Sequence, residues 1–235
     1  MSDAGEFTKS VALALGKFAD LLNKLAGPMA EEIGMMLGDK VRVYRVKNWI
    51  NTVAKTDRRL HEAGLAPHAV PPRLLLPIME ASSIEDNETL QDMWAGLLAT
   101  ASQDTDEISP SFVETLKQLT PDEARYLKRV CEIFLAEYKR DDLAPMELPG
   151  YKAFEKQGIS VRDVPWGTFE RLGLIHREYE VYAEHSTDGD RRPIIETQMD
   201  YWFVFTEHGV RFLTACEGPS PADSESGRTT SKSGG

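Results

Sequence analysis

The spacing of hydrophobic residues is the feature that most limits how this chain can fold. From Phe7 to about Lys139 these residues recur every three or four positions, which is the period of helices that bury one face. The spacing changes to alternation only between Leu174 and Phe205, where it predicts two strands. We therefore predict a mainly α fold, in which a multi-helix N-terminal domain precedes a small α+β C-terminal domain.

Proline and glycine residues divide this pattern into separate elements. Thr120-Pro121 provides a capping side chain and a first-turn proline, and Gly173 marks a helix end. The predicted helices are Phe7–Leu25, Pro28–Ala63, Arg73–Ser82 with a kink or restart at Pro77, Asp86–Ala101, Ser109–Leu119, Pro121–Lys139, Val161–Leu172 and Thr206–Cys216. The predicted strands are Leu174–Ala183 and Thr197–Phe205, with a polar tip at 184–193 between them.

The order of elements in the C-terminal half resembles a winged helix, in which a helix pair is followed by a strand, a wing, a second strand and a helix. The segments that carry this resemblance are Phe169–Ile175 (FERLGLI) and Phe205–Leu213 (FTEHGVRFL). The polar stretch Gln103–Ser109 predicts the domain boundary before it. We predict an N-terminal amphipathic helix at 1–26, a helical region at 27–108, a winged-helix-like domain at 109–216 and a disordered tail at 217–235.

The overall charge and the cysteines limit the classes of function. A formal charge of -11 argues against a protein that coats nucleic acid through net charge, because that affinity comes from neutralised phosphates. Cys131 and Cys216 stand in apolar helical segments, as expected for packing thiols in a reducing compartment. The chain has neither a signal-peptide pattern nor an apolar run long enough to span a bilayer, so we predict a cytoplasmic protein.

A basic segment is the first candidate site. Twenty residues with one acid, Asp57, contain seven basic side chains that could contact phosphates: Lys40, Arg42, Arg45, Lys47, Lys55, Arg58 and Arg59. Helical geometry points Arg42 and Arg45 away from Lys40 and Lys47, so no single basic stripe forms. We favour docking of this segment on an acidic one, either within the chain or between subunits. The acidic segment holds Glu80, Glu85, Asp86, Glu88 and Asp92.

Two further features lie near the N-terminus. Ala30, Gly34 and Gly38 stack on one helix face, where small side chains let another helix approach closely. The amphipathic helix at 7–25 carries three lysines, so it could act on a membrane, although packing on the next helix explains the same stripe.

The winged-helix-like region offers a third candidate site. Arg162, Arg191 and Arg192 occupy the positions from which a DNA reader would contact its target. Acidic residues stand beside each of them, and residues 120–216 hold 13 basic and 18 acidic side chains. This balance favours protein binding over DNA reading.

No group of residues has the spacing of a catalytic or metal site. The glutamates at 178, 180 and 184 alternate with Tyr179, Val181 and Ala183, which is the pattern of a solvated face over a core face. Nucleophile-elbow, zinc-protease and dinucleotide motifs are missing from the sequence. We therefore expect no catalytic residues, no metal ligands, no cofactor and no enzymatic activity.

Three blocks of sequence, in order, resemble the bacterial Abi-alpha (abortive infection alpha) family. They are Leu25–Ile50 (LAGPMAEEIGMMLGDKVRVYRVKNWI), Leu74–Ser102 (LLLPIMEASSIEDNETLQDMWAGLLATAS) and Pro110–Leu127 (PSFVETLKQLTPDEARYL). The resemblance covers roughly residues 20–215. It implies a role in abortive infection, in which an infected bacterium stops its own growth and so limits phage spread.

The family resemblance brings no catalytic residues with it, so the mechanism has to come from surfaces. We expect a non-catalytic protein that binds another protein or itself, as a homo-oligomer. Two alternatives stay open: a winged-helix DNA-binding regulator, and a growth-arrest effector that acts on membranes through residues 7–25.

Overall fold

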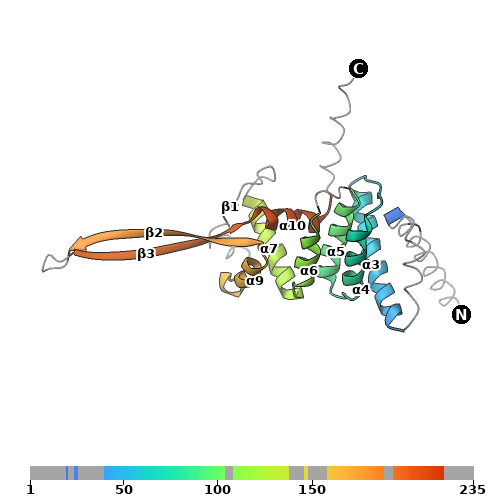
Figure 1. Cartoon of the computed structure of the whole chain (residues 1–235), viewed down its shortest axis with the longest axis horizontal. Helices are drawn as coiled ribbons and strands as arrows, with labels where there is room; N and C mark the ends of the chain where they lie inside the picture. The colour runs from blue at the N-terminus through green and yellow to red at the C-terminus, as the bar shows by residue number, and fades with distance from the viewer. Residues whose placement is uncertain are drawn as a thin grey trace, which may run out of the picture. The chain divides into compact units, whose positions relative to one another are not determined.

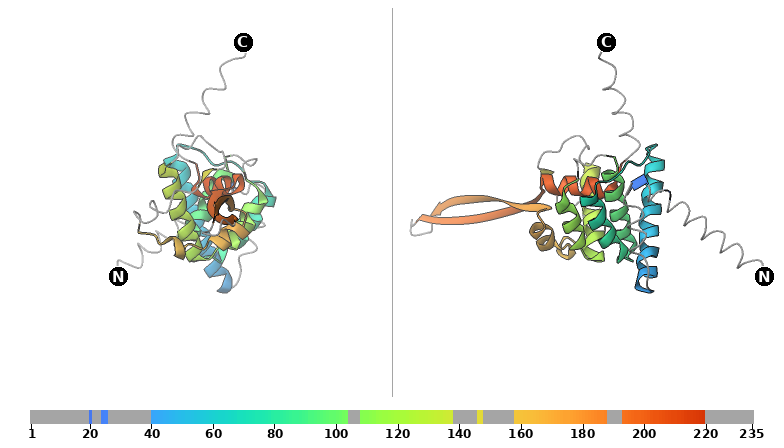
Figure 2. Two further views of the ribbon diagram at one scale, coloured as in Figure 1. Left: turned by 90° about the vertical axis from the view of Figure 1, so that its left-hand side faces the viewer. Right: turned by 45° about the vertical axis from the view of Figure 1, so that its right-hand side comes forward.

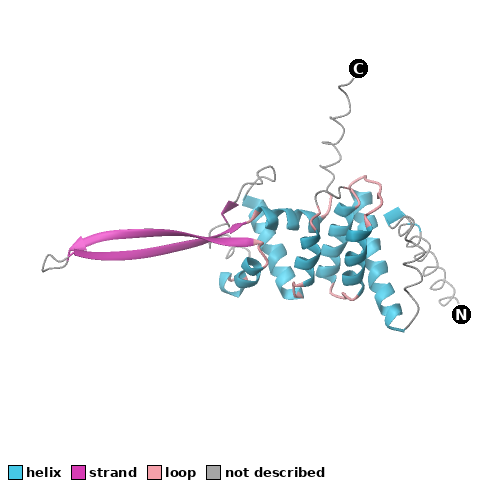
Figure 3. Ribbon diagram, viewed as in Figure 1, coloured by secondary structure: helices cyan, strands magenta, loops and turns pink. Residues whose placement is uncertain are grey.

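The computed structural model describes residues 20, 24–25, 40–103, 108–137, 146–147, 158–187 and 193–219. The fold is mainly α with one small antiparallel sheet toward the C-terminus, which confirms the predicted fold class (Figure 3). The chain forms two compact units, 1–124 with 214–235, and 125–213. The chain leaves the first unit within helix α7 (Pro121–Glu137) and returns to it within helix α10 (Glu207–Glu217). The predicted domain boundaries stay predictions.

Four helices build the described part of the first unit: α3 (Lys40–Glu62), α4 (Pro72–Ser83), α5 (Glu88–Ala101) and α6 (Pro110–Lys117). Helix α3 packs against both α4 and α5, and α6 packs against the same two helices (Figures 1 and 2). The apolar stripes predicted from the sequence meet in this core. Its largest fully buried side chains are Trp94, Phe112, Leu60, Leu74, Leu75 and Ile78.

Local signals in the sequence set the ends of these helices. The Asn87 side chain accepts hydrogen bonds from the backbone N–H groups of Thr89 and Leu90, which caps α5. Thr120 and Glu123 form a reciprocal capping box at the start of α7. After α3, Gly64 adopts a φ of 70°, a left-handed conformation that glycine accepts without the strain of a side chain.

Helix α4 runs unbroken through Pro77, so the predicted restart does not occur, whereas the predicted kink stays a prediction. A proline inside a helix removes one backbone hydrogen bond and crowds the preceding turn. Here Leu74, Leu75 and Ile78 are completely or almost completely buried around it. Burial of this apolar face offsets the local cost of the proline. Of the predicted helix Pro28–Ala63, residues 28–39 lie outside the described part of the chain.

The second unit contains a second departure from the prediction. The expected helix Val161–Leu172 is a 3-10 turn, η2 (Val161–Asp163), followed by a separate short helix, α9 (Trp166–Arg171). The helix is interrupted at Pro165, which lacks a backbone N–H and disfavours a helical conformation in the residue before it. Gly173, with a φ of 69°, ends α9 as predicted.

A long β-hairpin follows α9. Strands β2 (Ile175–Thr187) and β3 (Pro193–Phe205) pair antiparallel, with Ile175 opposite Phe205 and Thr187 opposite Pro193. Strand β2 extends four residues into the tip predicted at 184–193, and β3 begins at Pro193, four residues before the predicted start at Thr197. Sequence analysis also missed β1 (Met146–Glu147), which pairs with the inner end of β3 and gives the sheet order β1-β3-β2.

Two glycines allow backbones to come unusually close. A Cβ on Gly96 of α5 would lie 1.8 Å from the carbonyl oxygen of Cys216 in α10. A Cβ on Gly209 of α10 would lie 1.9 Å from the carbonyl oxygen of Leu174. At both positions any side chain would collide with backbone, so the packing requires glycine.

Candidate functional site

Lys55 of the predicted basic segment faces the acidic residues of α5. Its Nζ lies 2.8 Å from Asp92 Oδ1 and 3.9 Å from Glu88 Oε1. The Lys55 side chain is only 16% exposed, so packing holds it in this position. The basic and acidic segments therefore meet within the first unit at this point, as the docking interpretation expected.

Two arginines of α3 also contact neighbouring parts of the first unit. Arg59 donates to the backbone oxygen of Asp92 at 3.2 Å and to that of Glu217. Arg45 donates through Nε to the Ser83 hydroxyl at 2.9 Å. These contacts use directional donors of both guanidinium groups to hold α3 on its neighbours.

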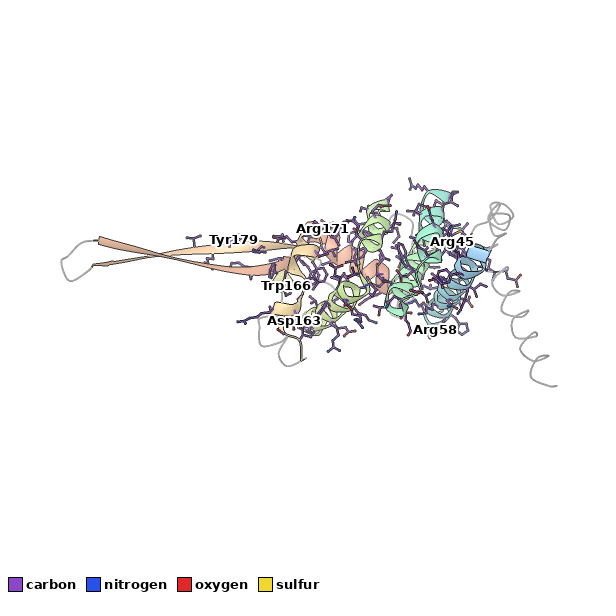
Figure 4. All side chains as sticks on the ribbon, turned by 90° about the horizontal axis from the view of Figure 1, so that it is seen from below. Arg45, Arg58, Asp163, Trp166, Arg171 and Tyr179 are labelled. Atoms are coloured by element: carbon purple, nitrogen blue, oxygen red, sulfur yellow. The ribbon has the colours of Figure 1, made fainter. Side chains whose placement is uncertain are left out.

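Lys47 and Arg58 are the exposed side chains of the basic segment in the part of α3 whose side chains are described. They stand eleven positions apart, or roughly 16 Å along the helix. Figure 4 shows Arg45 and Arg58 at different levels of α3. Lys40 and Arg42 belong to α3, but their side chains lie outside the described set. Binding of a macromolecule by this segment stays a prediction.

Several other predicted site residues are outside the described part of the chain: Ala30, Gly34, Gly38, Arg191 and Arg192. Arg162 lies in η2 and is exposed, and so is its neighbour Asp163. Of the predicted helix at 7–25, Leu25 is fully buried, and its carbonyl oxygen accepts a hydrogen bond from Val70 N at 2.9 Å.

The register divides the β2–β3 hairpin into two chemically different faces. On one face, which we call the apolar face, Ile175, Arg177 and the odd-numbered positions beyond them lie opposite odd-numbered positions of β3. Its five outer rows pair Tyr179 with Tyr201, Val181 with Met199, Ala183 with Thr197, His185 with Ile195 and Thr187 with Pro193. The other, acidic face holds Glu178, Glu180, Glu184, Glu196 and Asp200.

Helix α9 covers the base of the apolar face. The Trp166 ring stacks on Phe203, with ring centroids 4.5 Å apart and an angle of 11° between the planes. The Arg177 guanidinium lies 5.1 Å from the centre of the same Phe203 ring and binds Glu170 Oε2 at 3.2 Å. Ring stacking and the cation over the ring fix α9 on this row of the hairpin.

The apolar face becomes exposed one row further out. Ile175 is 1% exposed at the inner end, whereas Tyr179 and Val181 are 55% and 58% exposed. Figure 4 shows Tyr179 on the strand ribbon beyond Trp166. The sequence pattern predicted a core face here, and for these two residues that prediction is wrong. Alternation gives the face of a strand on which a residue lies, but it does not tell whether another element covers that face.

The pKa of His208 in α10 is lowered, chiefly by burial and further by the charge of Arg211. Among the described residues, no three His, Cys, Asp or Glu side chains gather in a way that could hold a metal ion. None of the helices described is both long and apolar enough to cross a membrane.

Comparison with known families identifies the chain over residues 44–216, which is well over half of its length. This segment matches the model of the family described as abortive infection alpha. The chain belongs to the Abi-alpha family. Neither the curated proteins nor the solved structures gave a significant match. Membership of the Abi-alpha family implies a role in abortive infection, the phage-defence response that the sequence resemblance had indicated.

The Abi-alpha match includes the described helices of the first unit from Tyr44 onward, together with α9 and the hairpin. The exposed apolar face therefore belongs to the matched region. Sequence reasoning missed this face, although one signal was available. The two strand-like runs and the tip between them span 174–205, which is long for the small domain that has to cover them.

Proposed function

We propose that this Abi-alpha protein acts in abortive infection without catalysis, by binding another macromolecule through the apolar face of its β2–β3 hairpin. The observation that carries this proposal is the exposure of Tyr179 and Val181, two large hydrophobic side chains in successive rows of one strand face. Single exposed hydrophobic residues are ordinary, whereas a run of them on one element is typical of an interaction surface.

The stability of the hairpin supports the same proposal. Two-stranded hairpins are marginally stable in water unless a third strand or a helix covers one face. Among the described residues, β1 pairs with β3 only at Val204 and Phe205, and α9 stacks on β3 at Phe203. A partner that buried the exposed apolar surface of Tyr179 and Val181 would add stability to this part of the hairpin.

The charge pattern favours a protein partner over DNA. Glu178 and Glu180 lie on the opposite face of β2, and Glu180 is exposed, so a phosphate backbone that approached this part of the strand would meet like charge. The expected DNA-reading helix is replaced by η2 and the short α9, where the exposed Arg162 stands beside Asp163 and the exposed Arg171 stands beside Glu170. We therefore propose a protein-binding use of this winged-helix-like arrangement.

The membrane alternative receives less support. Leu25, the last residue of the candidate membrane helix, is fully buried and bonded to Val70 N in the first unit. An attack on a lipid bilayer would have to break this contact. Deleting residues 1–23, which keeps the buried Leu25, should therefore leave phage protection intact, whereas a membrane effector would lose growth arrest entirely.

The proposal is tested by phage plaque assays in cells that express single variants at equal levels. Val181→Glu places a charge on the apolar face and is expected to restore plaque formation to the level of cells without the protein. Glu180→Gln, on the adjacent residue of the acidic face, is the matched control and should leave protection intact. Full protection by a folded Val181→Glu variant would contradict the proposal.

A further inference from the structure

We infer that the partner adds a strand to the outer edge of β2, and that this strand alternates apolar residues with basic ones. This inference rests on the proposed function, because it names the kind of partner that the hairpin binds. The sheet order β1-β3-β2 leaves β2 at an edge, and among the described residues it pairs only with β3. The N–H and C=O groups along an edge strand can pair with an extended segment of another chain.

Strand β2 is long and regular for an edge strand. It has 13 residues, more than twice the typical strand length of about 5–6 residues. Each residue pairs with one residue of β3, from Ile175 to Thr187, so no bulge interrupts the ladder. Proteins protect exposed edges with proline, lysine or bulges, and within its 13 residues β2 has none of them. The backbone of β2 is therefore a regular template for another strand.

The side chains in the middle of β2 leave room for an added strand. Tyr179 and Val181 are 55% and 58% exposed, and Glu180 between them is exposed as well. Successive residues of a strand point to opposite faces, so both faces of β2 are open to solvent at this point. The strand continues to Thr187, so an added strand that begins at Tyr179 could pair over nine residues (179–187), or about 30 Å.

The residues of β2 also determine which strand fits best. Glu178 and Glu180 lie on one face, and Val181 lies on the other. Opposite charges side by side on neighbouring strands stabilise the pairing, whereas like charges destabilise it. The added strand should therefore place Lys or Arg beside the two glutamates and apolar residues beside Val181. The net charge of -11 attracts such a basic segment before contact is made.

The same glutamates disfavour a second copy of this chain as the added strand. A second β2 that placed its apolar residues beside Val181 would also bring its own glutamates beside Glu178 and Glu180. Two chains that each carry a net charge of -11 repel each other as well. The acidic residues thus allow a basic strand to add to this edge and disfavour self-association.

Fluorescence anisotropy of a labelled peptide tests the predicted chemistry with the full-length chain. The peptide, of about ten residues, alternates Val with Lys, and it should bind saturably, whereas one that alternates Val with Glu should bind at least tenfold more weakly. Glu180→Lys should weaken binding of the Val–Lys peptide severalfold. Glu80→Lys, which changes an exposed residue of α4 and alters the net charge equally, is the matched control and should stay within twofold of wild type. No binding at about 1 mM peptide, or equal effects of the two substitutions, would overturn the inference.

Hydrogen exchange separates strand addition from contact through side chains alone. With the Val–Lys peptide bound, the backbone amides of β2 that point to its outer edge should exchange at least tenfold more slowly, and those of α9 should be unchanged. Unchanged exchange in β2 would overturn the inference, as would slowing that appears without peptide when the protein concentration is raised, which would identify a second copy. If Val181→Glu still abolished phage protection in either case, the hairpin would bind in another way and the proposed function would stand.

Discussion

Replacing Gly96 by alanine should destabilise the first unit more than any other glycine substitution among its described residues. The new Cβ would lie 1.8 Å from the carbonyl oxygen of Cys216 and 2.5 Å from its carbon, whereas carbon contacts are ordinarily about 3.5–4.0 Å. Both obstructing atoms belong to backbone, so no side chain can rotate away. The C-terminal turn of α10 must therefore move away from α5 by roughly 1.5 Å.

The magnitude follows from the contacts that this movement disturbs. Overpacking of this kind costs about 1–3 kcal/mol. The hydrogen bond from the Thr100 hydroxyl to the carbonyl oxygen of Ala215, 3.0 Å long, is stretched at a further cost of about 1 kcal/mol. Alanine returns about 1 kcal/mol through its better helix propensity. The last two contributions cancel, so the net loss of unfolding free energy is about 1–3 kcal/mol, which lowers the thermal midpoint by roughly 2–12 °C for a chain of this size.

Thermal and urea unfolding followed by circular dichroism measure this loss. Gly167→Ala is the matched control, because no atom lies within 4 Å of a Cβ at that helical position. Gly64→Ala also meets open space but strains a φ of 70°, so it should cost about 1 kcal/mol. If Gly96→Ala unfolded at the same midpoint as Gly167→Ala, the close approach of α5 to Cys216 would be refuted.

Three further predictions concern polar contacts. In a double-mutant cycle with Lys55→Met and Asp92→Asn, urea unfolding should give a coupling energy between the two residues of about 0.5–1 kcal/mol. The reason is that the ion pair, 2.8 Å long, is partly buried. A coupling energy of zero would show that the pair is not formed. Thr206→Val should cost about 1–2 kcal/mol in unfolding experiments, whereas Thr206→Ser should cost much less, since the hydroxyl donates to Gly173 O and accepts from Gly209 N. Because the pKa of His208 is lowered in the folded chain, the unfolded chain binds a proton at this histidine more readily, and the free energy of unfolding should fall as the pH drops below 6.5. His208→Gln should flatten a plot of unfolding free energy against pH in that range. An unchanged slope would contradict the lowered pKa of His208.

The helical part of the fold could be predicted from sequence because its signals are local. Asn87, Ser109 and Thr120 bond to backbone within the next three residues, so a short window of sequence specifies each helix start. Pro77 shows the limit of local signals. Its cost to α4 is local, but the burial of Leu75 and Ile78 that offsets it comes from the rest of the core.

The close approaches and the hairpin could not be predicted in this way. Nothing near Gly96 in the sequence points to Cys216, which is 120 residues away, so the need for glycine appears only when α5 and α10 are packed. Strands β2 and β3 were predicted too short because the charged residues beyond Ala183 and the proline at 193 resemble a loop. Proline is nevertheless tolerated at the first position of a strand, where β3 begins.

The exposed hairpin face also explains why one sequence pattern supports two different structural outcomes. Apart from Arg177, apolar and polar residues alternate from Ile175 to Val181, yet Ile175 is buried and Val181 is exposed. Among the described residues, α9 and the inner strand β1 contact only the first rows. A strand that ended near Tyr179 would place every apolar side chain against the unit that carries it. In the described residues beyond this point, Glu180 lies on one face and Val181 on the other, and both are exposed. A partner that covered Val181 would bury an apolar side chain and leave Glu180 in water, which is the reason for proposing that the protein acts through this face.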